Sequence, residues 1–103
     1  RLFMFEDCGE NAVEDDVRKL LRQHRPGDSR TNLRLLQRID AFCGNMEPRC
    51  REYRVCFFIH DAIPIILSIF NNIQQRLLQG AVDRVLAEEI AAAGCAALAS
   101  LAL

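Results

Sequence analysis

The fold is decided by the stretch from Phe57 to Leu78, which reads FFIHDAIPIILSIFNNIQQRLL. Between Ala62 and Phe70 its only polar side chain is that of Ser68. A helix that is apolar on every side is normally buried inside a protein. The stretch therefore predicts a central helix, which the amphipathic segments around it would cover.

Four further segments repeat their apolar residues at the three- and four-residue spacing of a helix. We expect these helices over residues 11–25, 31–43, 48–60 and 82–101. The first opens with Asn11 and Glu14, which match a capping box, after an expected turn at residues 8–10. Asp61 is expected to cap the central helix, with Pro64 in its first turn, where a missing N–H is tolerated. No segment alternates in the manner of a strand, so the sequence predicts an all-α fold, a compact bundle of about five helices with a buried apolar fourth helix.

The composition is that of one globular domain. The chain has 103 residues, of which 50% are apolar and 26% charged. This length suffices for one hydrophobic core but not for two. Because the chain begins with Arg1 and not with Met, we expect residues 1–103 to be a single helical domain taken from a longer protein.

The five cysteines indicate a reducing compartment. Their number is odd, so they cannot all pair within the chain. Three of them occupy apolar helical positions, where a free thiol behaves as a small hydrophobic group. We therefore expect an intracellular protein, cytoplasmic or nuclear. The uncharged C-terminal run, residues 90–103, is shorter than the roughly 20 residues that cross a bilayer, so no membrane partner is expected.

The apolar C-terminal segment suggests the leading function. After Glu89 the chain carries no charge and consists mainly of small residues, so this segment needs a surface to cover it. Apolar surface in excess of what short helices can hide indicates an interface. The sequence contains neither a phosphate-binding loop nor a nucleophile elbow, the motifs that would have suggested an enzyme. We therefore expect a protein–protein interaction or dimerisation module, a homo-oligomer in its simplest form, with no cofactor. Its expected contacts are Leu2, Phe3, Phe5, Ile90, Leu98 and Leu101.

Arginine rows supply the alternative function. Basic residues concentrate in residues 17–54, and all of the chain's basic residues except Lys19 are Arg. Arg pairs well with phosphates and carboxylates. Nucleic acid, RNA above all, or an acidic protein could bind such rows, although a solvated face is the simpler interpretation. The rows are Arg30, Arg34 and Arg38, and Arg49, Arg51 and Arg54.

The spacing Cys43-x6-Cys50-x5-Cys56-x3-His60 resembles that of the CCCH zinc fingers of RNA-binding proteins. The resemblance implies a zinc ion on three thiolates and one imidazole, a tetrahedral ligand set. Such fingers are rich in loops, whereas residues 49–59 have the pattern of a helix, on which positions 50 and 56 face different sides. Three core cysteines and a histidine at a helix end are the other interpretation, and it is the one we expect.

Residues 51–63, REYRVCFFIHDAI, also resemble the basic-aromatic-Asp helix of MIF4G-type HEAT domains in translation factors. In that family a Leu-Arg pair typically ends the segment, where this chain has Ile65 and Ile66. The resemblance spans thirteen residues and implies a HEAT-like form of the RNA-binding alternative.

Overall fold

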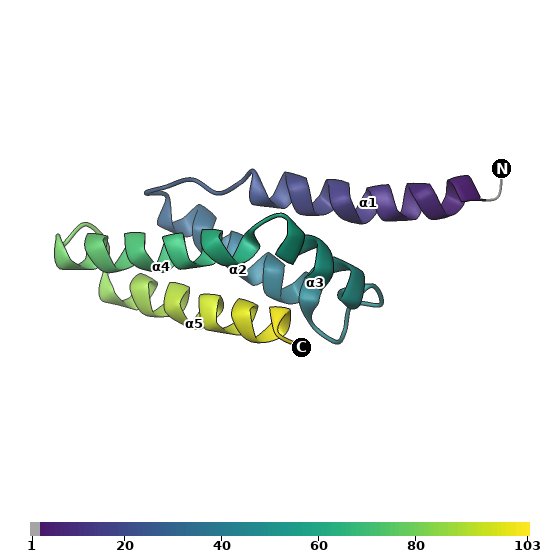
Figure 1. The fold of residues 1–103 in the computed structure, drawn as a ribbon. Helices are drawn as coiled ribbons and strands as arrows, with labels where there is room; N and C mark the ends of the chain where they lie inside the picture. Colours follow the sequence, from purple (N-terminus) through teal and green to yellow (C-terminus); the bar gives the residue numbers. More distant parts are fainter. Residues whose placement is uncertain (1–2) are drawn as a thin grey trace.

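The computed structural model describes the backbone from Phe3 to Leu103 and the side chains from Ala12 onward. The described chain forms helices and no strand, so the all-α prediction is confirmed. Figure 1 shows five helices joined by short connections. In chain order they are α1 (Phe3–Leu21), α2 (Ser29–Cys43), α3 (Cys50–Ile59), α4 (Ala62–Leu78) and α5 (Arg84–Leu101).

The centre of the bundle is formed by α2, α4 and α5. The contact of α2 with α5 is the most extensive between any two helices, and α4 lies beside α5 (Figure 1). Each helix turns one apolar face inward at helical spacing. The fourth helix is buried along one side, whereas Leu67 and Leu78 on its other side are exposed. The central buried residues include Leu35, Leu36 and Ile39 of α2, Ile66, Ile69 and Ile73 of α4, and Ala87, Ile90 and Ala97 of α5.

The small residues of α5 let it approach α4 closely. Gly94 is buried, and the ring of Phe70 occupies the space beside it. A Cβ atom at position 94 would lie 2.2 Å from Cε1 of Phe70, far inside van der Waals contact. Gly costs about 1 kcal/mol against Ala in the interior of a helix. Here that cost is offset by the packing of an aromatic ring against the bare helix backbone.

Polar side chains stabilise the helix ends and the loops between helices. Asn32 is buried at the start of α2, where its amide accepts from the N–H of Arg25 (3.3 Å) and donates to the C=O of the same residue (3.1 Å). Asp28 and Asp83 cap α2 and α5 by accepting from backbone N–H groups. Asp61 stands at the predicted cap position of α4, but its side chain makes no capping hydrogen bond. Its φ of 64° is left-handed, a conformation that Asp adopts more readily than most residues, and it accompanies a 71° bend between α3 and α4.

The first helix begins earlier than its capping pattern predicts. The backbone is helical from Phe3, so the expected turn at residues 8–10 and the expected start at Asn11 are wrong. A single Gly, here Gly9, costs too little to end a helix whose neighbours favour it. The helix packs chiefly against α3 and extends past it towards its own N-terminus (Figure 1).

The hydropathy of single helices and of the α3–α4 pair gives different results for membrane crossing. Within residues 3–103, no single helix is both long and apolar enough to cross a membrane. Taken together, α3 and α4 reach the required length and composition, with the 71° bend between them.

We predict that Gly94→Ala lowers the free energy of unfolding by about 1–3 kcal/mol, the usual cost of overpacking, because the new methyl group displaces the Phe70 ring. In a Phe70→Leu background the space is free, so the same substitution should be neutral or stabilise by up to about 1 kcal/mol. Denaturant unfolding of the four proteins measures both effects. Stabilisation by Gly94→Ala in the wild-type background would contradict the observed packing.

Candidate functional site

The outer side of α3 exposes three large apolar side chains. Tyr53 and Phe57 face the core, whereas Val55, Phe58 and Ile59 are 59%, 68% and 65% exposed. These three positions are spaced by three and four residues, so they share one helix face, which we call the α3 apolar face. The inner pair, Tyr53 and Phe57, has the four-residue spacing by which the sequence predicts this helix. That spacing gave no reason to expect that the opposite face would lack a covering helix.

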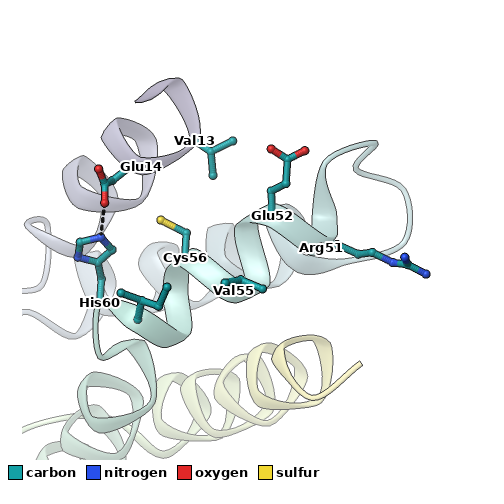
Figure 2. Close-up of a pocket in the computed structure, with 8 residues that line it drawn as sticks. Val13, Glu14, Arg51, Glu52, Val55, Cys56 and His60 are labelled. Carbon is teal, nitrogen blue, oxygen red and sulfur yellow. Dashed lines mark hydrogen bonds and ion pairs between the residues drawn. The ribbon is translucent and has the colours of Figure 1, made fainter. Parts of the chain in front are cut away.

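Two hollows flank the α3 apolar face. One is a cleft of about 540 Å³ between α1 and α3, shown in Figure 2, which Val13, Glu14, Cys56 and His60 help to line. The other is a groove of about 540 Å³ between α3 and the C-terminal end of α5. Its lining residues are Arg51, Arg54, Val55, Phe58, Leu101 and Leu103.

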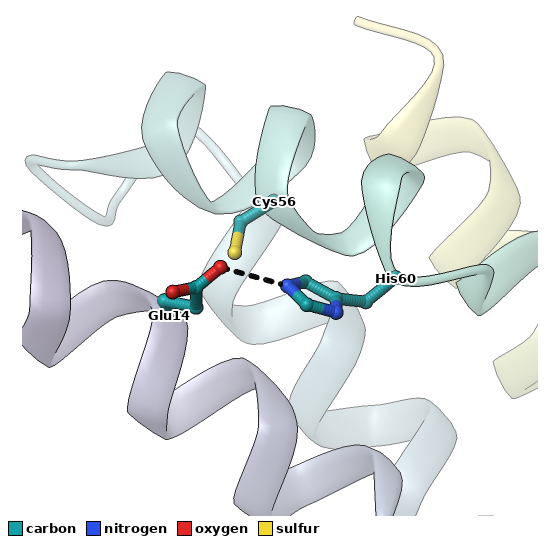
Figure 3. A group of neighbouring side chains, drawn as sticks. All are labelled: Glu14, Cys56 and His60. Atoms are coloured by element: carbon teal, nitrogen blue, oxygen red, sulfur yellow. Dashed lines mark hydrogen bonds and ion pairs between the residues drawn. The ribbon is translucent and has the colours of Figure 1, made fainter.

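Three potential metal ligands converge in the α1–α3 cleft. Oε2 of Glu14 in α1 accepts a hydrogen bond from Nε2 of His60 at 3.1 Å, and the thiol of Cys56 points towards the same place (Figure 3). One ligand atom from each side chain lies within 4.8 Å of the other two. Arg18 lies 3.5 Å from the second carboxylate oxygen of Glu14. The three side chains are half-buried and come from two helices that are distant in sequence.

The environment of Cys56 does not activate it as a free nucleophile. Burial raises the pKa of its thiol, and the carboxylate of Glu14 raises it further. Reactive cysteines have lowered pKa values in electropositive surroundings. The raised thiol pKa therefore disfavours a Cys–His nucleophile at this site.

A second polar contact joins α1 to α3. The hydroxyl of Tyr53 donates to the carboxylate of Asp16 at 2.9 Å, and its ring packs 4.5 Å from that of Phe42. Burial, followed by the hydrogen bond to Asp16, raises the pKa of Tyr53 to about 12. Tyr53 thus connects α1, α2 and α3.

The structure changes the expected interface. Ile90 is fully buried between the central helices, so its assignment as an interface residue is wrong; close packing of the small residues of α5 encloses it. Leu98 and Leu101 are half-buried against the core. Leu2 lies outside the described residues, and so do the side chains of Phe3 and Phe5.

The arginine rows divide into exposed and structural residues. Arg30, Arg34 and Arg38 are exposed along α2. Arg49, the residue before α3, forms an ion pair with Glu52. Arg54 is half-buried. It donates to the carbonyl of Cys43 (2.9 Å), and further to Asn45 and Cys50 at the α2–α3 connection. The remaining member, Arg51, is exposed at the α3 apolar face.

The cysteine–histidine quartet that the CCCH resemblance implies is not assembled. Cys43 is fully buried in the core, where burial raises the pKa of its thiol to about 12. Cys50 lies next to the guanidinium of Arg54. Of the four, only Cys56 and His60 meet, because they stand one helical turn apart, and the third member of their group is Glu14. The CCCH arrangement is therefore not formed.

Comparisons with models of protein families, with curated proteins and with solved structures found no match for this chain. The function must therefore be inferred from the geometry of the α3 side of the bundle.

Tyr53 is the only tyrosine, and the chain has no tryptophan, so absorbance at the tyrosinate band reports on it alone. We predict a midpoint near pH 12 in the folded protein, against about 10 in the unfolded chain. Because the folded pKa is the higher one, the free energy of unfolding should fall as the pH rises from about 10 to about 12. Asp16→Asn should lower the midpoint. An unshifted wild-type midpoint would contradict the Tyr53–Asp16 contact.

Proposed function

We propose that this chain is a non-enzymatic protein-interaction domain that binds an amphipathic, acidic helix of another protein across the α3 apolar face. The observation that carries the proposal is the exposure of Val55, Phe58 and Ile59 on one side of one short helix. Single exposed apolar residues are normal on protein surfaces, but a contiguous group flanked by polar residues is typical of an interaction site.

The size of the face favours a bound helix over a permanent dimer. The ten residues of α3 extend over roughly 15 Å, at 1.5 Å per residue. Stable protein interfaces bury about 1,600 Å² in total, which a single short helix face supplies only in part. An amphipathic helix that lies in a groove needs a few anchor side chains at helical spacing. The hollows on either side of the face would receive such anchors.

The charge around the groove favours an acidic partner. Arg51 forms no ion pair with any side chain from residue 12 onward. Among the side chains described from residue 12 onward, Arg54 donates to uncharged groups alone, so those contacts do not neutralise its positive charge. A carboxylate of the partner that reaches the groove beside Leu101 would meet both guanidinium groups. Pairs of this kind fix the orientation of a bound segment.

The test uses a displayed library of amphipathic helical peptides, selected on the purified protein. We predict that selected peptides carry acidic residues and protect α3 from amide hydrogen exchange. Phe58→Asp should weaken their binding by about tenfold or more, since a central apolar anchor is worth at least 1–2 kcal/mol. Val85→Asp is the matched control, because Val85 is 69% exposed on the first turn of α5, away from the groove, and should leave binding unchanged.

Two results would contradict this proposal. Selected peptides could bind with equal affinity to the Phe58→Asp variant. Alternatively, light scattering could show a dimer that Phe58→Asp dissociates and Val85→Asp does not. The second result would assign the α3 apolar face to self-association, the homo-oligomer that the sequence led us to expect.

A second candidate function, RNA binding, rests on the α2 row of Arg30, Arg34 and Arg38. These three arginines are exposed, and none forms an ion pair with a side chain that the structure describes. Arg49 and Arg54, by contrast, are used within the fold, so the basic surface is smaller than the sequence indicates.

For this second candidate we predict that the anisotropy of a labelled single-stranded RNA rises with added protein and that binding weakens steeply with salt. The double variant Arg34→Glu with Arg38→Glu should lose the signal. The double variant Lys19→Glu with Arg84→Glu changes the net charge equally at exposed positions elsewhere and should retain most of it. Equal loss in both variants would indicate a non-specific effect of charge and would end the assignment to α2.

A further inference from the structure

We propose that Glu14, Cys56 and His60 form a three-ligand site for Zn²⁺, with the fourth coordination position open to the cleft between α1 and α3. Its three ligands are distinct from the residues of the α3 apolar face that would anchor the partner helix proposed above. The site also differs from the CCCH arrangement, because it replaces two of the cysteines with a glutamate from another helix.

The geometry of the three side chains supports this assignment. Cys56 and His60 are four residues apart, so both project to the same side of α3 at its C-terminal end. Glu14 reaches them from α1, as Figure 3 shows. Zinc bonds of about 2.0–2.3 Å in a tetrahedron place the ligand atoms roughly 3.3–3.7 Å apart. The observed spacing, within 4.8 Å, therefore needs only small side-chain rotations around an ion.

The charges of the ligands also fit a divalent cation. One thiolate and one carboxylate balance the two positive charges, and His60 binds as a neutral imidazole. The occupied site of ion, thiolate, carboxylate and neutral imidazole is then electrically neutral, which lowers the cost of partly burying the ion. Arg18 contacts Oε1 of Glu14 at 3.5 Å, whereas His60 contacts Oε2, so Arg18 can hold the carboxylate while Oε2 binds the ion. Outer contacts of this kind orient metal ligands.

The choice of zinc follows from the ligand types. Thiolate and imidazole select zinc over magnesium and calcium, which prefer oxygen ligands only. Binding exchanges one proton: the S–H bond of Cys56 breaks, a Zn–S bond forms, and the proton leaves to solvent, with no change of oxidation state. Zinc affinity should therefore increase with pH. Three protein ligands with an open position also match the zinc sites that hold a water or an external ligand.

The ion would cross-link α1 to α3. Without it, the described polar contacts between these helices are Glu14 to His60 and Asp16 to Tyr53. Zinc would replace the first of these with three strong bonds. Because Glu14 lies in the first half of the chain and Cys56 and His60 in the second, metal binding would stabilise the folded arrangement and not the unfolded chain.

The experiment is a titration of the reduced, metal-free protein with Co²⁺, followed by displacement with Zn²⁺. We expect one ion per chain and a thiolate-to-cobalt charge-transfer band. Cys56→Ser should abolish the band, and Glu14→Gln and His60→Asn should each weaken binding by more than roughly tenfold. Cys95→Ser is the matched control, since Cys95 is a free and exposed cysteine outside the cleft, and should leave the spectrum unchanged.

The result that would overturn the proposal is a folded wild-type protein that gives no charge-transfer band, or a band that Cys95→Ser removes and Cys56→Ser does not. Circular dichroism checks that each variant remains folded. If Cys56→Ser does not fold, unchanged affinity in Glu14→Gln and His60→Asn would equally exclude the site.

Discussion

The close packing of α5 against α2 and α4 is the constraint on which the rest of the structure depends. The bare backbone at Gly94 admits the ring of Phe70, and the small residues around it bury Ile90 completely. This packing buries one face of the C-terminal segment, with Ile90, Gly94 and Ala97, in the core. The bend at Asp61 then turns α3 away from α4, so the outer side of α3 is left for α1 on one flank and for solvent on the other. The α3 apolar face and the metal-ligand cluster therefore lie on the outer side of α3, which the central helices leave uncovered.

The sequence was sufficient for features that depend on local periodicity. Helical spacing identified the inner faces of α2 and α3, and residue type placed Asp61 at the cap position of α4. It failed where distant segments meet. Whether Ile90 is an interface or a core residue depends on α2, some fifty residues away in the chain. The pairing of Cys56 and His60 was visible as a four-residue spacing, but their third partner, Glu14, lies 46 residues before His60 and carried no local signal.

The two flanks of α3 carry different kinds of side chain, and each flank supports a different proposed function. The flank towards α1 contains a carboxylate, a thiol and an imidazole, which together suit a cation. The flank towards the end of α5 contains apolar side chains and two arginines, which suit an acidic helix. Ile59 lies on the α3 apolar face and also lines the cleft. On this view, an ion that fixes α1 would also fix one wall of the surface that the partner contacts.

In the proposed arrangement, a metal ion on Glu14, Cys56 and His60 links α1 to α3, in addition to the core contacts of Val13, Val17 and Leu20. Amide hydrogen exchange, followed residue by residue with and without zinc, tests this most directly. We expect the amides of residues 12–21 to exchange by local opening, at a lower free energy than those of α2 and α5, and to be slowed when zinc is added. Amides of α1 that exchange only on global unfolding, at a rate that zinc does not alter, would contradict the claim.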